Sequence, residues 1–266
     1  MKNQISMLLR KSGLIKIVDN LRFYLLYLIT YCKRQSFKKA NPAAILPPSY
    51  FIYETFGMDY EQFYNLSLKT ATWLISWFKR YKPLNGVSIL DWGCGPGRII
   101  RHLPALLDES CRCYGTDYNT KYIKWCVENI PEVTFKPNNL APPLPFGDEM
   151  FDIIYGISIF THLSAKMHYA WFEELLRVLK PGGILFLTLH GKVFKTKLSE
   201  AQRKIFDQGY LVVLSNTKEG HRTYGAYHPP SFVIKLASKT KILEYEEGGF
   251  IKGKPQQDIW IFQKFV

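Results

Sequence analysis

The stretch 87–103, V-S-I-L-D-W-G-C-G-P-G-R-I-I-R-H-L, constrains the fold of this chain more than any other part of the sequence. Residues 87–90 form a short apolar run that includes β-branched residues, which predicts a buried strand. Three glycines at alternate positions then predict a tight turn, and apolar residues resume after it at helical spacing. Because glycine has no Cβ, the turn lets the backbone approach a ligand at the open N-terminus of the helix. Asp91 closes the strand, and we expect its carboxylate beside that ligand.

Two common glycine-rich loops do not match this turn. The dinucleotide-binding fingerprint G-x-G-x-x-G requires glycine at position 98, where Arg98 stands, and a phosphate-binding P-loop requires a closing G-K-[ST]. The remaining pattern, D-x-G-x-G-x-G, resembles motif I of class I S-adenosylmethionine-dependent methyltransferases, although the motif alone is also compatible with a purely structural turn. The resemblance implies cofactor binding by Asp91, Gly93, Cys94, Gly95 and Gly97.

A second carboxylate follows at the end of the next predicted strand, residues 111–117. Asp117 lies twenty residues after Gly97, at the tip of the second strand of a βαβ unit. A carboxylate at this place can accept hydrogen bonds from both hydroxyls of a ribose. The alternative is an N-cap for the helix predicted over 119–129, and the two roles can coexist because strand tip and helix start are adjacent. We expect Tyr118 to lie against the adenosine.

The segment between the third and fourth strands extends the resemblance. A short strand is predicted at 133–136, and the stretch 138–152 resembles the methyltransferase segment in which an acidic residue precedes L-P-F and D-x-x-F-D opens strand four. Asn139 stands where the family usually has Asp, and its amide oxygen can still accept a hydrogen bond from the adenine amino group. The fourth strand is predicted at 151–157. The resemblance adds Asn139, Leu140 and Ile157 to the cofactor site.

Histidines near the ends of the predicted strands are candidate general bases. Ligands of open α/β sheets bind at the carboxyl ends of the strands, and S-I-F-T-H-L-S (158–164) follows the fourth strand directly. His162 therefore faces either the acceptor or, as the alternative, a packing neighbour at the start of the helix predicted over 165–179. By position in the chain, the candidates in order of preference are His162, His228 and His190.

The remainder of the domain completes a pattern typical of the same family. L-K-P-G-G within 176–190 is one of the commonest family features, and it predicts a turn before a fifth strand. Alternation predicts two further strands at 241–246 and 258–265, which fit an antiparallel pair at the end of a parallel sheet. We therefore expect an α/β fold over 51–266. It is a Rossmann-like, seven-stranded, mostly parallel sheet, the class I methyltransferase fold, with helices on both faces and an N-terminal helical extension.

Residues 1–50 form a basic, amphipathic extension that ends in a proline-rich linker. Its longest apolar run, 23–31, is interrupted only by Thr30 and is shorter than the about 20 residues that cross a bilayer. No small-residue cleavage site of a signal peptide follows that run. Residues 1–40 therefore predict either peripheral contact with the inner membrane surface or a helix that docks on the protein's own core or on a dimer partner.

Charge and cysteine content restrict the partners and the compartment. The formal net charge of +13 favours an acidic partner, which is nucleic acid, anionic lipid or an anionic substrate, unless it serves only solubility. The five cysteines are odd in number, and the pair at 111 and 113 has C-x-C spacing rather than C-x-x-C. We therefore expect reduced cysteines in a cytoplasmic protein and no metal site.

The resemblance implies an enzyme that uses S-adenosylmethionine. The combination of P-P-L-P-F, S-x-F-T-H-L and Y-H-P-P-S-F resembles the branch that modifies small molecules or glycans, often found among enzymes of bacterial surface polysaccharides. It implies O-methylation of a small-molecule or glycan hydroxyl by in-line transfer. One alternative is a nucleic-acid methyltransferase, which the charge favours, but no Asn/Asp-P-P-[YF] segment follows the fourth strand. An inactive interaction module and a nicotinamide oxidoreductase are the others; the intact cofactor motif disfavours the first and Arg98 the second.

Overall fold

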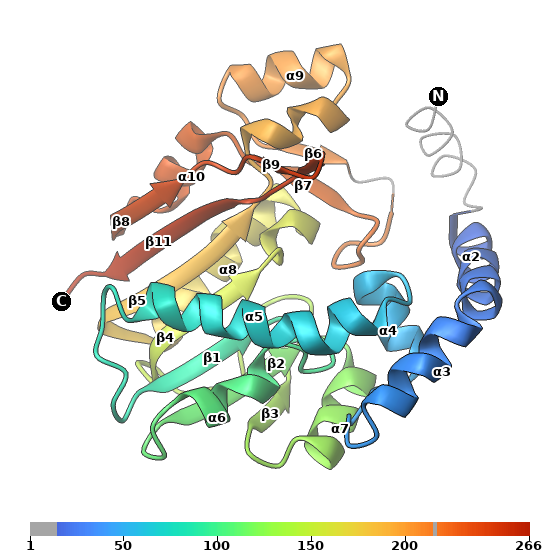
Figure 1. Ribbon diagram of the computed structural model, residues 1–266. Coiled ribbons are helices and arrows are strands. Elements are labelled where there is room, and N and C mark those ends of the chain that lie inside the picture. The colour runs from blue at the N-terminus through green and yellow to red at the C-terminus, as the bar shows by residue number, and fades with distance from the viewer. Residues whose placement is uncertain (1–14, 215–216) are drawn as a thin grey trace.

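A seven-stranded sheet forms the centre of the computed structural model of this chain, which describes residues 15–214 and 217–266 (Figure 1). The strand order is β3-β2-β1-β4-β5-β11-β8, and all neighbours pair in parallel except β11, which is antiparallel to β5 and β8. The strands are β1 (Ser88–Trp92), β2 (Arg112–Asp117), β3 (Thr134–Pro137), β4 (Phe151–Ile157), β5 (Leu179–Leu189), β8 (Thr240–Glu246) and β11 (Asp258–Lys264). The expected fold class is confirmed.

Helices cover both faces of the sheet and form an N-terminal segment at its edge (Figure 1). The helices are α2 (Ile15–Ile29), α3 (Tyr31–Ala40), α4 (Ser49–Phe56), α5 (Tyr60–Phe78), α6 (Leu103–Leu106), α7 (Thr120–Asn129), α8 (Ala165–Val178), α9 (Glu200–Asp207) and α10 (Pro230–Leu236). Asp59 caps α5, because its side chain accepts a hydrogen bond from the Gln62 backbone N–H. Within the described parts of the chain, none of the helices has the length and apolar character that a bilayer crossing requires.

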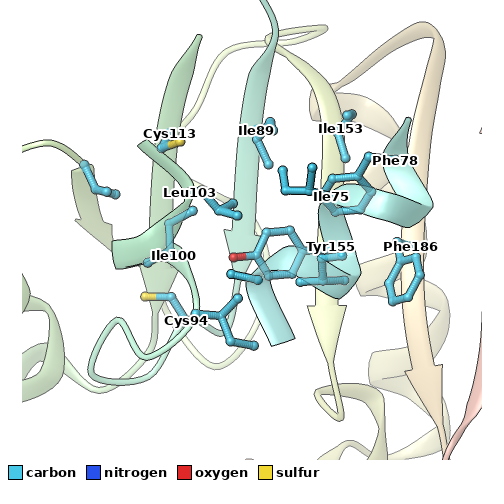
Figure 2. Packing of buried hydrophobic residues seen from close by; sticks show 14 of the residues in the cluster. Ile75, Phe78, Ile89, Cys94, Ile100, Leu103, Cys113, Ile153, Tyr155 and Phe186 are labelled. Atoms are coloured by element: carbon cyan, nitrogen blue, oxygen red, sulfur yellow. The ribbon is translucent and has the colours of Figure 1, made fainter. Parts of the chain in front are cut away.

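The two faces of the sheet bury separate apolar clusters. Figure 2 shows Ile75 and Phe78 of α5 packed over Ile153 and Tyr155 of β4 and over Phe186 of β5. Side chains next to these in sequence point to the opposite face, against α8 and α10, since successive side chains of a strand alternate. Both faces are therefore sealed, and the carboxyl ends of the parallel strands form the edge at which a ligand can bind.

The structure differs from the sequence expectations at three places. After the glycine turn, a single 3-10 turn, η1 (Ile100–His102), and the four-residue α6 replace a regular helix. The Pro-Gly-Gly segment, 181–183, lies inside β5, where the pairing with β4 shifts register, and does not form a separate turn. Two small sheets also join the carboxyl-terminal part, β6 (Val212–Leu214) with β7 (Gly225–Tyr227) and β9 (Phe250–Ile251) with β10 (Lys254–Pro255).

Candidate functional site

A cavity of about 1010 Å³ opens at the carboxyl ends of β1, β2 and β4. Of the residues that the sequence singled out, the following line it: Asp91, Gly93, Cys94, Gly95, Asp117, Tyr118, Asn139, Leu140, Ile157, His162 and His190. Gly97 and His228 do not line it. Its position agrees with the general rule for ligand sites in open α/β sheets.

The glycine turn presents its backbone to the cavity at Gly95. Gly95 has a φ of +53°, which favours glycine, and a Cβ at this residue would meet no atom within 4 Å. Its N–H donates to the Asp117 carboxylate at 2.9 Å. At Gly97, by contrast, a Cβ would lie 2.5 Å from Ile130 and 3.2 Å from Cys126. Gly97 thus allows close packing against α7 and does not line the cavity, so its expected cofactor contact stays a prediction.

Asp91 is a buried carboxylate at the end of β1, with 3% of its surface exposed. Burial raises the pKa of Asp91 to about 7, against the opposing effects of Tyr155 and Arg98. No Lys or Arg nitrogen among the described residues lies within ion-pair distance of it. A buried carboxylate that faces a cavity and forms no close ion pair is suited to a ligand that carries a positive charge.

Asp117 lies at the end of β2, and backbone donors hold its two oxygens. One oxygen accepts from Gly95, and the other accepts from the Asn119 N–H at 2.8 Å. Burial raises the pKa of Asp117 to about 6, against these two hydrogen bonds. Asn119 is the N-cap of α7, since its side chain accepts from the Lys121 N–H. The capping role considered for Asp117 thus belongs to Asn119, which leaves further lone pairs of Asp117 open to the cavity.

The segment after β3 forms another part of the cavity wall. Asn138 Oδ1 accepts from the Thr116 hydroxyl at 2.8 Å, which fixes the loop to β2. The Leu140 carbonyl accepts from the Trp171 indole at 3.0 Å. On the other side, the Tyr118 hydroxyl donates to the Gly220 carbonyl at 3.1 Å. Hydrogen bonds therefore hold the segment that contains the cavity-lining residues Asn139 and Leu140.

His162 and His190 both line the cavity as neutral imidazoles with a defined tautomer. His162 Nδ1 donates to the Tyr224 carbonyl at 3.1 Å, and His190 Nδ1 donates to the Ala226 carbonyl at 3.2 Å. A carbonyl only accepts, so the lone pair of each ring is on Nε2. Burial lowers the pKa of His162, and it lowers the pKa of His190 to about 3. His190 also stacks on Phe194 with ring centroids 4.1 Å apart.

His228 is placed differently from the expectation. Its side chain is 1% exposed and lies against His168, with the two Nε2 atoms 2.8 Å apart. Burial lowers its pKa well below the ordinary value. A base must reach the proton that it removes. His228 therefore does not serve as the acceptor's base in this arrangement, and the pair with His168 instead fixes the start of α10 against α8.

A polar network at the carboxyl end of β4 is not predicted by the sequence pattern. Ser158, directly after β4, has a φ of +65°, which is strained for a residue other than glycine. Its N–H donates to Thr188 Oγ1 at 2.9 Å, and its hydroxyl accepts from the Gln257 amide at 2.6 Å. Thr188 in turn donates to Gln257 at 2.6 Å. All three residues line the cavity, and no local signal connects Gln257 to Ser158.

Other lining residues come from the N-terminal helices and from the loop after β6. Glu54 of α4 accepts from the Tyr122 hydroxyl, and His221 and Arg222 lie on the opposite loop. All five cysteines are free. Among the residues that the structure describes, no group of three or more His, Cys, Asp or Glu side chains is arranged to hold a metal ion.

The sheet order, the single antiparallel strand and the glycine turn at the end of β1 define the class I methyltransferase fold. A family described as "Methyltransferase domain" matches residues 89–183. The solved structure of magnesium protoporphyrin IX methyltransferase from Synechocystis PCC 6803, with bound S-adenosylhomocysteine, aligns over 99% of this chain and 100% of its own. Its TM-score is 0.54 and its identity 14%. Residues 89–183 are thus similar to methyltransferase domains, and the fold is that of the class I S-adenosylmethionine-dependent methyltransferases, a class whose cofactor is S-adenosylmethionine.

Two curated relatives are similar to a part of the chain. One is tRNA (carboxymethyluridine(34)-5-O)-methyltransferase from Arabidopsis thaliana, 35% identical over 40% of this chain and 24% of its own length. The other is 2-methyl-6-phytyl-1,4-hydroquinone methyltransferase from Synechocystis sp., 36% identical over 38% of this chain and 31% of its own. The matched part thus spans about a quarter to a third of the length of these relatives.

Proposed function

We propose that this chain transfers the methyl group of S-adenosylmethionine to a hydroxyl of a small molecule or a glycan, bound in the cavity of about 1010 Å³. The observation that supports this most is the pairing of two buried carboxylates, Asp91 and Asp117, across the open backbone of Gly95. A ligand with a cationic end and a ribose matches this pairing. The enclosed space beyond these groups leaves room for an acceptor.

Each residue of the cofactor half has a distinct role in this proposal. Asp91 would hold the ammonium group of the methionine end, and the open lone pairs of Asp117 would accept from the ribose hydroxyls. Asn139 and Leu140 would border the adenine, with Tyr118 on its other side. The bound cofactor supplies an electrophilic methyl group. The protein's own part is to align an acceptor with it, which can contribute up to about 7–11 kcal/mol.

His162 is the favoured base for the acceptor hydroxyl. It follows β4, it lines the cavity, and the Tyr224 carbonyl orients it with the lone pair on Nε2. General-base assistance is typically worth about 10²–10⁴-fold. His190 is the second candidate, and its pKa of about 3 makes it the weaker base. The strained Ser158 and its partner Gln257 lie on the same side and would position the acceptor.

The cofactor part is tested by calorimetry with S-adenosylhomocysteine. We expect micromolar binding to the unmodified chain and at least about tenfold weaker binding for Asp91→Asn and for Asp117→Asn, since each removes a charge-assisted hydrogen bond. Glu132→Gln is the control, because Glu132 is an exposed carboxylate outside the cavity. If the unmodified chain shows no heat with S-adenosylhomocysteine, the proposal fails.

The acceptor is tested by a methyl-transfer screen with nucleotide sugars, lipid-linked glycans and RNA. RNA is included because the net charge of +13 and the tRNA-modifying relative both support a nucleic-acid acceptor as the second candidate. A quinone-modifying relative supports a small-molecule acceptor. Transfer to RNA alone would replace the proposed acceptor class. Cofactor binding without transfer to any acceptor would favour an interaction module.

Residues 1–40 are the second part of the proposal. Residues 1–14 lie outside the described residues, and of the two alternatives that the sequence leaves open for this segment we propose peripheral contact with the inner face of a membrane, which would place a cytoplasmic enzyme at that surface. Exposed apolar side chains on α2 support this part.

A further inference from the structure

The outward face of α2 is apolar along its whole described length. Its exposed apolar side chains recur at helical spacing, as Ile17, Val18, Leu21, Tyr24, Leu25, Leu28 and Ile29. Leu28 is 72% exposed and Leu21 64%. An amphipathic surface helix normally directs this face toward the protein core. Here no described residue covers the face, and in Figure 1 α2 lies at the periphery of the molecule.

The opposite face of α2 is the one that attaches to the protein. Phe23 packs edge-on against Tyr50 and Tyr53 of α4, with ring centroids 5.2 and 5.4 Å apart. Asp19, one turn earlier, accepts from the Tyr53 hydroxyl at 2.6 Å. The helix is thus docked on α4 through a polar and aromatic face. The exposed apolar residues named above, here called the stripe, lie outside this contact.

The charges around the stripe indicate what covers it. Between residues 15 and 40 the sequence has six basic residues and one acidic residue, Asp19. Asp19 faces inward, whereas Arg22, Lys33, Lys38 and Lys39 are exposed. A second copy of this chain on the stripe would bring like charges together. An anionic lipid surface complements both features, because it accepts the apolar stripe and attracts the cations.

The inward side of α2 reaches the cavity wall. Asp19 forms an ion pair with Arg222, and Arg222 also contacts the Tyr53 hydroxyl at 3.2 Å. Arg222 lines the cavity on the loop that also carries His221. One ion pair therefore separates the apolar helix from the wall of the site.

We propose that the outer face of α2 rests on an anionic bilayer surface and holds the Arg222 side of the cavity close to it. On this basis, which rests on the proposed methyl transfer, the acceptor is an amphiphile anchored in that bilayer. The exposed cations of α2 and α3 lie among the lipid headgroups, while the apolar side chains of the stripe enter the acyl boundary.

Cosedimentation of the full chain with vesicles tests this assignment. We expect at least about tenfold stronger association with vesicles that contain phosphatidylglycerol than with phosphatidylcholine vesicles. Leu21→Glu/Leu28→Glu is expected to lower the association with anionic vesicles by at least about tenfold. The control is Ile205→Glu/Ile234→Glu, which charges two exposed apolar residues on α9 and α10 and should pellet like the unmodified chain.

Calorimetry with S-adenosylhomocysteine on the same samples separates this inference from the proposed function. Cofactor binding by Leu21→Glu/Leu28→Glu shows that the variant is folded, so lost pelleting then reports on the stripe alone. Equal pelleting of both double variants would overturn the assignment, and so would failure of the unmodified chain to pellet. If light scattering shows a dimer that Leu21→Glu/Leu28→Glu splits, and vesicles are not bound, the stripe is an interface between two copies. If the unmodified chain pellets with anionic vesicles but does not bind S-adenosylhomocysteine, that result instead contradicts the proposed function.

Discussion

The burial of a single residue, Asp91, affects how strongly a cationic ligand can bind. Its carboxyl has a pKa of about 7 because it is buried, so a large fraction is protonated near neutral pH. A cationic ligand binds the ionised form, and its affinity therefore depends on how much of that form is present. The neighbouring Asp117 has a pKa of about 6, so its ionised fraction falls by only about half between pH 8 and pH 6 and adds less to the effect.

The affinity for S-adenosylhomocysteine is accordingly expected to fall about tenfold between pH 8 and pH 6, as the ionised fraction of Asp91 falls through its pKa. Calorimetry at the two pH values measures this. Asp91→Asn should bind more weakly at pH 8 and should lose most of the pH dependence in this range. A pH-independent affinity of the unmodified chain would show that Asp91 does not face the charged end of the cofactor.

Glycine residues of one motif can have different roles, as Gly95 and Gly97 show. The motif D-x-G-x-G-x-G suggests that all three glycines serve the ligand. In the structure Gly95 and Gly97 differ in their surroundings. A Cβ at Gly95 would enter open space, whereas a Cβ at Gly97 would meet Ile130 of the segment after α7. A linear pattern does not contain this information, which depends on how a helix packs against the turn.

At the scale of elements, α2 is joined to the cavity loop by Asp19 and Arg222. Their side chains are 14% and 28% exposed, so the pair is only partly screened by water. The pKa of Asp19 is lowered by its hydrogen bonds to Tyr53 and Arg222, in opposition to burial, which raises it. The interaction thus favours the ionised carboxylate and fixes two segments that are far apart in the sequence.

Asp19→Asn is expected to lower the free energy of unfolding by about 1–3 kcal/mol, since it leaves Arg222 without its charged partner. It should also speed hydrogen exchange in residues 217–224. Urea denaturation and exchange measured by mass spectrometry test both effects. Glu200→Gln, which breaks the exposed pair with Lys204, is the control and should cost less than about 0.5 kcal/mol. If both variants lower the free energy of unfolding by the same amount, Asp19 does not hold α2 in place.

Elements built from continuous segments were predicted well from the sequence. The buried parallel strands appear as short apolar runs, and the cofactor half of the cavity follows from β1, β2 and the segment after β3, all within one half of the chain. The rest of the cavity wall could not be predicted. It joins Ser158 to Gln257 and Asp19 to Arg222, and these partners are brought together only by the closed sheet and the docked α2. His228 shows the same limit, because its burial against His168 comes from packing between helices.

At the scale of the whole molecule, the N-terminal segment is part of the folded structure. Phe37 of α3 is buried with Ile52 of α4 and with Tyr60 and Phe63 of α5. The boundary expected at residue 50 therefore does not separate two independent cores. Removal of α2 and α3 would expose this cluster and would take away the Asp19 carboxylate that pairs with Arg222.

Deletion of residues 1–40 is accordingly expected to lower the free energy of unfolding by at least about 2 kcal/mol, the approximate value of burying one large apolar side chain. Leu21→Glu/Leu28→Glu, which changes only exposed side chains, should unfold at the same urea concentration as the unmodified chain. Urea denaturation followed by circular dichroism compares the three proteins. A deletion variant as stable as the full chain would show that this cluster contributes little.

The position of β11 between β5 and β8 also has a consequence for biosynthesis. While the chain is being made, β5 and β8 both precede β11, so the sheet edge along β5 has no partner until residue 264 has been synthesised. Unpaired apolar strand edges are prone to aggregation. Gln257, which completes the network at Ser158, reaches its place only with this strand. The strands β1 to β4 can thus pair before the chain is complete, whereas the outer edge of β5 and the network at Ser158 are completed only when β11 pairs with β5.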